Sequence, residues 1–243
     1  MWYVVQTMTN EEELFKKMYE TVNDDNGYRL FIPTIILKKH YHKEWHSVKK
    51  VMFPGYVFVE TDDIEEFAKN VSGTYCFSKL LKAGDEITPV SKEEKEFLES
   101  MMDDDYCVNY SQGFIVGEDV VITEGALRNQ SALIRKVDRH RRIAVLDVKM
   151  FGRMTPIEVG FGAFARVSQE EWENCRKENI ERYEQENNSS QENNVRVISG
   201  VFTGMTGQLL SLDTAKNECF VELELFGTPT KVAFGRDEVK LIS

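Results

Sequence analysis

The alternation of apolar and polar positions is clearest in residues 51–60, which read Val-Met-Phe-Pro-Gly-Tyr-Val-Phe-Val-Glu. Val57 and Val59 alternate with Tyr56 and Phe58, so both faces of this predicted strand carry large side chains. The Pro-Gly pair before the strand predicts a fixed bend. Two explanations of the aromatic second face stay open: a strand buried on both sides, or a surface that meets a partner.

The pattern up to residue 102 alternates short strands with amphipathic helices. A strand at residues 2–6 precedes a helix in which Leu14, Met18 and Val22 recur on one face, with Phe15 and Tyr19 beside them. Continued along the chain, the order of elements is β-α-β-β-β-α-β-α. This order predicts a mixed sheet with helices packed on it.

Residues 38–46, Lys-Lys-His-Tyr-His-Lys-Glu-Trp-His, are dense in bases and aromatic rings. The three histidines fit no standard zinc signature and have no cysteine nearby, so we expect no metal site. The segment is predicted to be a solvated hairpin tip whose cations and rings could also contact nucleic acid.

The second half of the chain contains an internal repeat, because residues 120–152 align without a gap on residues 195–227. Phe151-Gly152 falls on Phe226-Gly227, and Thr155-Pro156 and Thr228-Pro229 follow in the two copies. The first copy has Asn129 and Ala132 where the second has Gly204 and Gly207. Short alternating strands between Gly, Asp and Pro turns predict a small barrel of about five strands in each copy.

The connection between the two copies begins with a capping box at residues 168–171 and continues into a stretch that is charged nearly all round. A helix with so few apolar groups is expected to dock weakly. The polar residues 187–194 that follow it predict a flexible tether, so the last barrel is expected to move relative to the rest.

The charge of the chain is uneven. Its 243 residues carry a net charge of −11, yet residues 113–168 hold nine Lys and Arg against six Asp and Glu. Basic residues in an otherwise acidic chain favour contact with phosphates, and a solvated basic face is the alternative. The candidates for RNA binding are Arg128, Arg135, Lys136, Arg139, Arg141, Arg142, Lys149 and Arg153.

Several classes of function find no support in the sequence. There is no P-loop, G-x-G-x-x-G, G-x-S-x-G or H-E-x-x-H motif, so we expect no enzyme activity and no cofactor. The four cysteines are far apart and suit a reducing compartment. Without a targeting segment or a membrane-length apolar run, the protein is expected to be a cytoplasmic monomer that does not enter a membrane.

Three motifs carry a resemblance to a known family. Phe53-Pro-Gly-Tyr-Val-Phe-Val, together with Trp2-Tyr3-Val4-Val5, resembles the N-terminal (NGN) domain of the NusG family of transcription elongation factors. Residues 200–207 resemble the KOW motif of SH3-like barrels. Residues 139–142 and 150–156 are similar to specialised antiterminators of the LoaP kind.

The resemblance implies an α+β fold with an NGN-type mixed-sheet domain and two KOW barrels joined by a charged helix and linker. The expected limits are residues 1–106 for the NGN domain, 107–113 for a linker, 114–168 and 194–243 for the barrels, and 169–193 for the charged helix and tether.

The resemblance also implies a function, namely processive antitermination. The N-terminal domain would bind the clamp helices of the largest RNA polymerase subunits through Tyr3, Phe53, Pro54, Tyr56 and Phe58. The first barrel would contact a nascent RNA hairpin. Phe151 and Phe226 would contact the termination factor Rho or a ribosomal protein, and a phenylalanine that only fills the barrel core is the alternative. A translation-associated RNA-binding protein with KOW barrels is the alternative.

Overall fold

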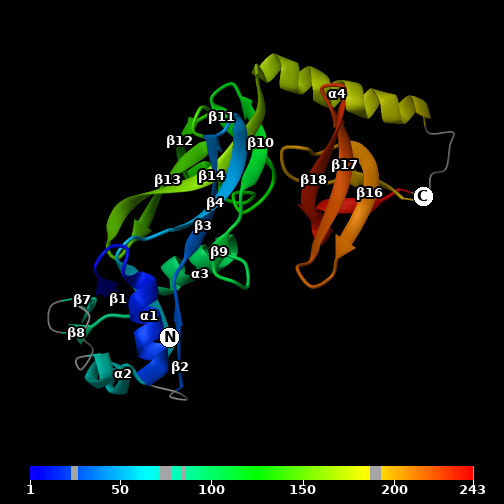
Figure 1. Ribbon diagram of the computed structural model, residues 1–243. Helices are drawn as coiled ribbons and strands as arrows, with labels where there is room; N and C mark the ends of the chain where they lie inside the picture. The colour runs from blue at the N-terminus through cyan, green and yellow to red at the C-terminus, as the bar shows by residue number, and fades with distance from the viewer. Residues whose placement is uncertain (23–26, 72–77, 84–85, 187–192, 243) are drawn as a thin grey trace. The chain divides into compact units, whose positions relative to one another are not determined.

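The protein is described by a computed structural model that covers residues 1–22, 27–71, 78–83, 86–186 and 193–242 (Figure 1). Most of the predicted tether, at residues 187–192, and one of the four cysteines, Cys76, lie outside the described residues. The chain divides into two compact units. The first unit comprises residues 1–110 and 132–161, and the second comprises residues 111–131 and 162–243.

The first unit is built on an antiparallel sheet with the strand order β2-β5-β1-β6. Its strands are β1 (Trp2–Thr7), β2 (Tyr28–Phe31), β5 (Tyr56–Thr61) and β6 (Ser78–Leu80), and its helices are α1 (Glu12–Val22), α2 (Ile64–Val71) and α3 (Lys92–Met101). The predicted mixed α+β fold is confirmed. Ser91 and Glu94 form a capping box at the start of α3, in which each side chain accepts a hydrogen bond from the backbone N–H of the other residue.

One face of this sheet is covered by α1 and α2. Phe15 and Tyr19 of α1 and Phe67 of α2 pack on sheet residues in a single core. Leu14, which the sequence placed on the inner face of α1, is 51% exposed, so that prediction was wrong. The helix turns its two aromatic residues inward because aromatic rings bury more apolar area than leucine does.

A long hairpin formed by β3 (Thr34–Tyr41) and β4 (Glu44–Val51) extends from the first unit. Its turn lies at His42 and Lys43, both with positive φ, which confirms the predicted hairpin tip. Residues 107–108, expected in a linker, form the strand β9 (Cys107–Val108) and pair in parallel with β3. The Asp103 carboxylate organises this segment by accepting hydrogen bonds from the Cys107 N–H (2.9 Å) and the Asn109 amide (2.8 Å).

The first unit also contains an antiparallel ladder made by part of the first repeat. Its strands are β12 (Ile134–Asp138), β13 (Ile143–Met150) and β14 (Arg153–Val167), preceded by a 3-10 turn at Ser131–Leu133. A small hairpin, β7 (Lys82–Ala83) with β8 (Glu86–Ile87), precedes α3. β14 continues into the second unit, where the Gly117 N–H donates to the Val167 carbonyl (2.9 Å).

The second unit combines a hairpin, a helix and a five-stranded barrel sheet. The hairpin is β10 (Ser111–Val116) with β11 (Asp119–Glu124), and the helix is α4 (Gln169–Glu186). The barrel sheet, in the order β18-β17-β16-β15-β19, consists of β15 (Asn194–Val197), β16 (Thr206–Asp213), β17 (Glu218–Leu225), β18 (Thr228–Gly235) and β19 (Val239–Leu241), with a 3-10 turn at Arg236–Glu238. The prediction of about five strands in each copy is confirmed, because the strands of the first copy also form one five-stranded sheet, in the order β11-β10-β14-β13-β12.

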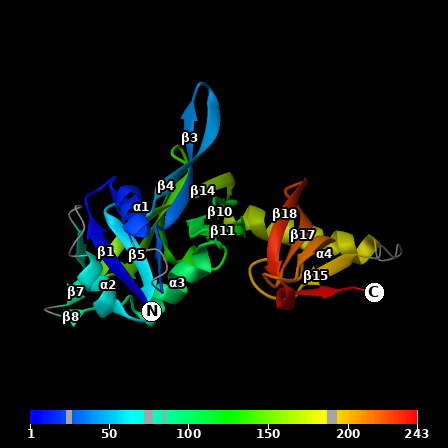
Figure 2. The same cartoon turned by 60° about the horizontal axis from the view of Figure 1, so that its bottom comes forward.

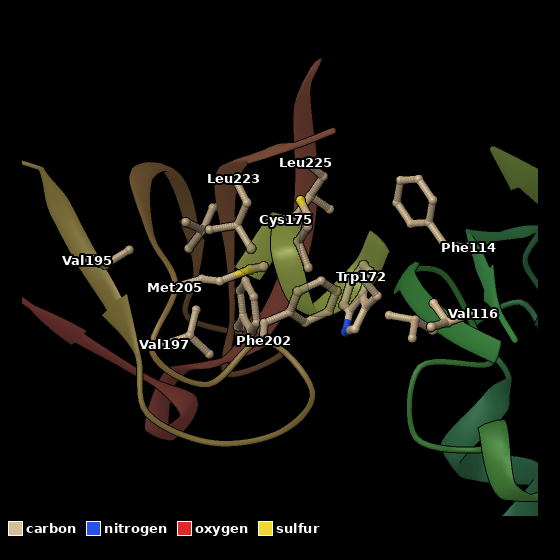
Figure 3. Close-up of a cluster of buried hydrophobic side chains, with 14 of the residues drawn as sticks. Phe114, Val116, Trp172, Cys175, Val195, Val197, Phe202, Met205, Leu223 and Leu225 are labelled. Carbon is tan, nitrogen blue, oxygen red and sulfur yellow. The ribbon is translucent and has the colours of Figure 1, made fainter. Parts of the chain in front are cut away.

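The helix α4 is firmly docked, contrary to the expectation of weak docking. Trp172 and Cys175 are buried in the core of the second unit, where Trp172 lies between Phe202 and Phe114 (Figure 3). Asn179, one turn further along the helix, is also buried. Trp172 and Cys175 enter one hydrophobic core and Asn179 lies one turn further on, so a mostly charged helix still buries one edge.

The repeat is visible in the backbone as well as in the sequence. Positive φ angles recur at matching positions: Gly125 (98°) and Gly200 (79°), Arg142 (54°) and Asn217 (53°), Phe151 (54°) and Phe226 (52°). The copies differ where Ala132 replaces Gly207. Ala132 lies in a 3-10 turn, whereas a Cβ at Gly207 would lie 2.2 Å from the Glu222 carbonyl oxygen. The second barrel therefore needs a glycine at this point and the first copy does not.

Candidate functional site

A tight turn precedes β5 and sets the position of the aromatic residues around it. Gly55 has φ 84° and follows Pro54, and the Tyr56 N–H donates to the Phe53 carbonyl (3.1 Å), as in a type II turn. The Gly55 N–H donates to the buried carboxylate of Glu12 (2.5 Å). The turn is thereby tied to the first turn of α1.

The five residues predicted to bind polymerase do not all share one surface. Phe53 and Phe58 are buried, Tyr56 is half-buried and Pro54 is exposed. Their rings lie on the sheet face away from α1 and α2. Tyr3 belongs to the opposite, helix-covered core. The structure therefore brings together Phe53, Tyr56 and Phe58, which form the aromatic face with Phe31, and it separates Tyr3 from them.

The members of the aromatic face are in mutual contact. The Phe58 ring lies 5.9 Å from Phe53 and 5.3 Å from Phe31 between centroids. Phe31 stacks in turn on Tyr106 at 3.9 Å. Phe31 and Tyr106 were missed in the sequence, although the place of Phe31 at the end of an apolar run in β2 was a usable signal.

The aromatic face is covered by the tip of the β13–β14 hairpin. The Phe151 ring stacks on Tyr56 with centroids 5.3 Å apart and an interplanar angle of 24°. It also meets Phe53 at 5.6 Å and Phe58 at 6.1 Å. Two sets of residues predicted to bind different partners are thus in contact with each other within the first unit.

A pocket of about 790 Å³ lies beside the hairpin tip. Its apolar lining comes from the N-terminal sheet and α3 region, including Val4, Leu81 and Phe97, and from the hairpin, including Phe151 and Met154. Met154 is itself 65% exposed. Phe151 therefore lines this pocket as well as covering the aromatic face.

The predicted RNA-binding residues fall into two groups. Arg128 lies in the second unit, where its guanidinium pairs with Glu218 (3.2 Å) and with Glu238. Its side chain is only 15% exposed. Arg128 thus has a structural role in joining the β11 loop to the second barrel, and the other seven residues lie in the first unit.

Within the first unit, two arginines are engaged in ion pairs. Arg135 pairs with Asp147 (3.1 Å), and Arg141 makes two 3.0 Å contacts with the Glu158 carboxylate. Lys136, Arg139, Lys149 and Arg153 are exposed. The turn that carries Arg139 and Arg141 is shaped by Asp138, which accepts a hydrogen bond from the Arg141 N–H (3.0 Å). This hydrogen bond is the main reason that the pKa of the Asp138 carboxyl is lowered.

Arg142 lies over the ring of Trp45 with the guanidinium carbon 4.0 Å from the centroid. It also interacts with Tyr110, whose pKa is raised by burial, with the charge and hydrogen bond of Arg142 opposing that rise. Arg142 therefore links the β12–β13 turn to the β3–β4 hairpin, a connection that the sequence did not reveal.

Phe226, the counterpart of Phe151 in the second copy, is 38% exposed. Its ring lies 5.4 Å from Phe114 and 6.0 Å from Trp172. Its N–H donates to the Cys175 sulfur (3.2 Å). Both hairpin-tip phenylalanines are therefore packed on aromatic residues of their own unit.

Metal-binding groups and membrane-spanning helices are two further features that bear on function. No group of three or more His, Cys, Asp or Glu side chains among the described residues is arranged to hold a metal ion. Within the same part of the chain, none of the helices has the length and apolar character needed to cross a bilayer.

Known proteins that are similar to this chain identify its family. The family model described as "Transcription termination factor nusG" matches residues 1–99. The transcription termination/antitermination protein NusG of Bacillus subtilis is 31% identical over 169 residues, which make up 66% of this chain and 94% of that relative. This chain belongs to the NusG family.

Other NusG proteins are similar over the same part of the chain. The NusG of Helicobacter pylori strain J99 is 25% identical over 172 residues, 68% of this chain and 98% of that protein. A solved structure titled "Domain interaction in Thermotoga maritima NusG" is 19% identical, with a TM-score of 0.27, and covers 100% of this chain and 97% of that one. Both of these curated relatives are described as transcription termination/antitermination proteins.

Proposed function

We propose that this NusG-type transcription termination/antitermination factor binds the clamp helices of the largest RNA polymerase subunits through its aromatic face. Bridging the clamp would favour the closed, processive polymerase and promote antitermination. The single observation that carries this proposal is that Tyr56, Phe53 and Phe58 are covered by a side chain from the repeat, Phe151. An aromatic surface that is covered by a removable segment is available to a partner once the segment leaves.

The chemistry of the aromatic face suits a helical partner. Aromatic anchors in well-packed pockets commonly supply most of the energy of a protein interface. Tyr56 combines a flat apolar ring with a hydroxyl at its edge, which lets it pack on apolar helix residues and still hydrogen-bond at the rim. The apolar pocket beside the tip would extend this surface.

In the conformation described here, Phe151 takes the place that a polymerase helix would occupy. Polymerase binding would therefore select a form in which the hairpin tip has left the aromatic face. Release would also expose Phe151 for a second partner, either Rho or a ribosomal protein. Phe226 is proposed for the same kind of contact from the second barrel.

Contact with nascent RNA is proposed for the exposed cations of the first repeat, namely Lys136, Arg139, Lys149 and Arg153, with Arg135, Arg141 and Arg142 beside them. Guanidinium groups bind phosphates bidentately and stack on exposed bases. A hairpin in the nascent transcript is the ligand expected if the chain is an antiterminator of the LoaP kind. Arg128 makes ion pairs within the second unit and is the least suited of the eight to this role.

Transcription by purified bacterial RNA polymerase through an intrinsic terminator tests the proposal. The wild-type chain should raise the fraction of transcripts that read through, and Tyr56→Ala should abolish the increase. Phe220→Ala, at a half-buried ring of the second barrel, is a control that should keep it. Readthrough by Tyr56→Ala equal to wild type, with an unchanged circular dichroism spectrum, would contradict the proposal.

A further inference from the structure

The pocket beside the tip of the β13–β14 hairpin has the size of a small-molecule site. Its volume of about 790 Å³ falls within the range of roughly 300–1,000 Å³ that is typical of ligand sites. Every residue that lines it belongs to the first unit. Among its apolar lining residues, Val4 is buried, whereas Leu133 and Met154 are 36% and 65% exposed. The pocket therefore reaches from the core to the surface, and a molecule can enter it from solvent.

One wall of the pocket is held in place by the N-terminal sheet. The two ends of the β7–β8 hairpin are hydrogen-bonded to β1 (Figure 2). The Leu81 N–H donates to the Val4 carbonyl (2.9 Å), and the Val90 N–H donates to the Trp2 carbonyl (2.8 Å). Phe97 of α3 adds an aromatic ring to this wall. Because the wall is preformed by backbone hydrogen bonds, a ligand loses little affinity to the ordering of loops.

The other wall of the pocket is the β13–β14 hairpin itself. Lys149 and Met154 are cross-strand partners, so their side chains stand on the same face of this hairpin, and both line the pocket. Phe151 at the tip lines the pocket and at the same time stacks on Tyr56. A molecule in the pocket therefore contacts both the N-terminal sheet and the segment that covers the aromatic face.

The charged residues of the lining favour a ligand with a negative group. Lys82 lies on one wall and Lys149 on the other, and neither makes an ion pair within the part of the chain that the structure describes. Two of the three carboxylates in the lining are already engaged, since Asp147 is in an ion pair and Glu94 belongs to the capping box of α3. Glu93 is the third. The two lysines therefore outnumber the one carboxylate that is left to oppose an anion.

We propose that this pocket binds a small amphiphilic anion, namely a molecule with an aromatic ring system and one carboxylate or sulfonate group. The rings pack on Phe97 and Phe151, and the anionic group pairs with Lys82. Because the bound molecule contacts both walls, it stabilises the form in which the hairpin tip covers the aromatic face, and it therefore opposes polymerase binding. This regulatory effect rests on the proposed function, whereas the ligand site does not.

Anilinonaphthalene sulfonate, an aromatic anion whose fluorescence rises in apolar surroundings, is the probe for the site. Titration of the full-length protein should show saturable binding at one site per chain. Met154→Glu should weaken binding about tenfold or more, because it replaces an apolar contact by a carboxylate that repels the sulfonate. Met8→Glu is the matched control, since Met8 is 54% exposed and lies outside the lining of the pocket. Wild-type affinity in Met154→Glu would overturn the site.

The negative group of the ligand has a test of its own, because phenylnaphthylamine has the same rings as the probe but no sulfonate. Lys82→Gln should weaken binding of the sulfonate about two- to fivefold, as expected for one exposed charge pair, and should leave the affinity for phenylnaphthylamine unchanged. Lys79→Gln, at an exposed lysine of β6, should change neither affinity. The same effect of Lys82→Gln on both probes, or no effect on either, would overturn the assignment of an anion.

Titration of bacterial RNA polymerase with and without the probe separates this inference from the proposed function. With anilinonaphthalene sulfonate at about ten times its dissociation constant, the wild-type chain should bind polymerase about tenfold more weakly. The polymerase affinity of Met154→Glu should not respond to the probe, which controls for direct effects on polymerase. A probe that binds the pocket without changing polymerase affinity would support the site and contradict the proposed competition. A probe that does not bind, with Tyr56→Ala still defective, would overturn the site and leave the proposed function intact.

Discussion

Phe151 and Phe226 each occupy the first position of a two-residue hairpin turn, with φ of 54° and 52°, and each is followed by a glycine with positive φ. This backbone conformation is typical of a type I′ turn, in which asparagine and glycine are preferred. Adopting this conformation costs a residue with a Cβ about 1–2 kcal/mol. The ring contacts of the phenylalanine, which in the first copy are made with Tyr56, Phe53 and Phe58, offset this cost.

Phe151→Asn should destabilise the protein less than the loss of a core phenylalanine does. The substitution relieves about 1–2 kcal/mol of backbone strain and removes ring contacts worth about 0.5–1.5 kcal/mol beyond their buried area. We expect the free energy of unfolding, measured with urea, to fall by less than about 2 kcal/mol when the half-buried area of the ring is included.

Phe161→Ala serves as the reference for a phenylalanine that only fills the core, because Phe161 is fully buried. It should cost about 3–5 kcal/mol. If Phe151→Asn destabilises the protein as much as Phe161→Ala, then Phe151 is a core residue and not a removable cover.

At the scale of secondary-structure elements, a polar residue adds to the docking that Trp172 and Cys175 give α4. The Asn179 side chain accepts a hydrogen bond from the Thr206 N–H (2.8 Å) and donates one to the Thr206 carbonyl (3.2 Å). The amide thereby completes the backbone hydrogen bonding at the start of β16. A pattern of apolar positions does not predict such docking, because the residue that makes it looks like part of a solvated face.

Asn179→Ala should lower the free energy of unfolding of the protein by about 1–3 kcal/mol, since it leaves a buried N–H and a buried carbonyl of Thr206 without partners. Thermal and urea unfolding monitored by circular dichroism would measure the loss. Asn174→Ala is the matched control, because Asn174 is an exposed asparagine of the same helix. Equal stability of the two variants would show that Asn179 does not dock the helix.

Turns and alternating strands were the most predictable elements. The bend at Pro54-Gly55, the capping box at Ser168 and the Phe-Gly turns of the repeat each depend on residues with narrow backbone preferences. The inner face of α1 and the placement of Tyr3 were not predictable to the same degree. Both depend on which face of an element meets which neighbour, and that choice is made by tertiary packing rather than by local sequence.

At the scale of the whole molecule, the two compact units follow packing rather than the repeat. Residues 132–161 of the first copy belong with the N-terminal sheet, whereas residues 111–131 belong with α4 and the second barrel. Sequence similarity reveals which segments share an ancestor or a fold. It does not reveal which surfaces bury each other, so the predicted domain limits remain predictions.

For the candidate site too, the sequence indicated individual residues but not which of them are in contact. Phe53, Tyr56 and Phe58 of the aromatic face were singled out in the sequence, and so was the phenylalanine that covers them, but as contacts for different partners. Their direct contact joins them into one hypothesis, in which the hairpin tip and an RNA polymerase helix compete for the same surface. The affinity for polymerase is then reduced by the free energy needed to move the hairpin tip off the aromatic face, because only the open form binds.

Titration of bacterial RNA polymerase with the full-length protein tests this account most directly. Phe151→Asn should bind about tenfold more tightly than wild type if the closed form is favoured by about 1.4 kcal/mol. Tyr56→Ala should bind more weakly, and Phe226→Asn, the same change at the matching position of the second copy, should bind as wild type does. Wild-type affinity in both Phe151→Asn and Tyr56→Ala would contradict the central claim that polymerase binds the aromatic face and competes there with Phe151.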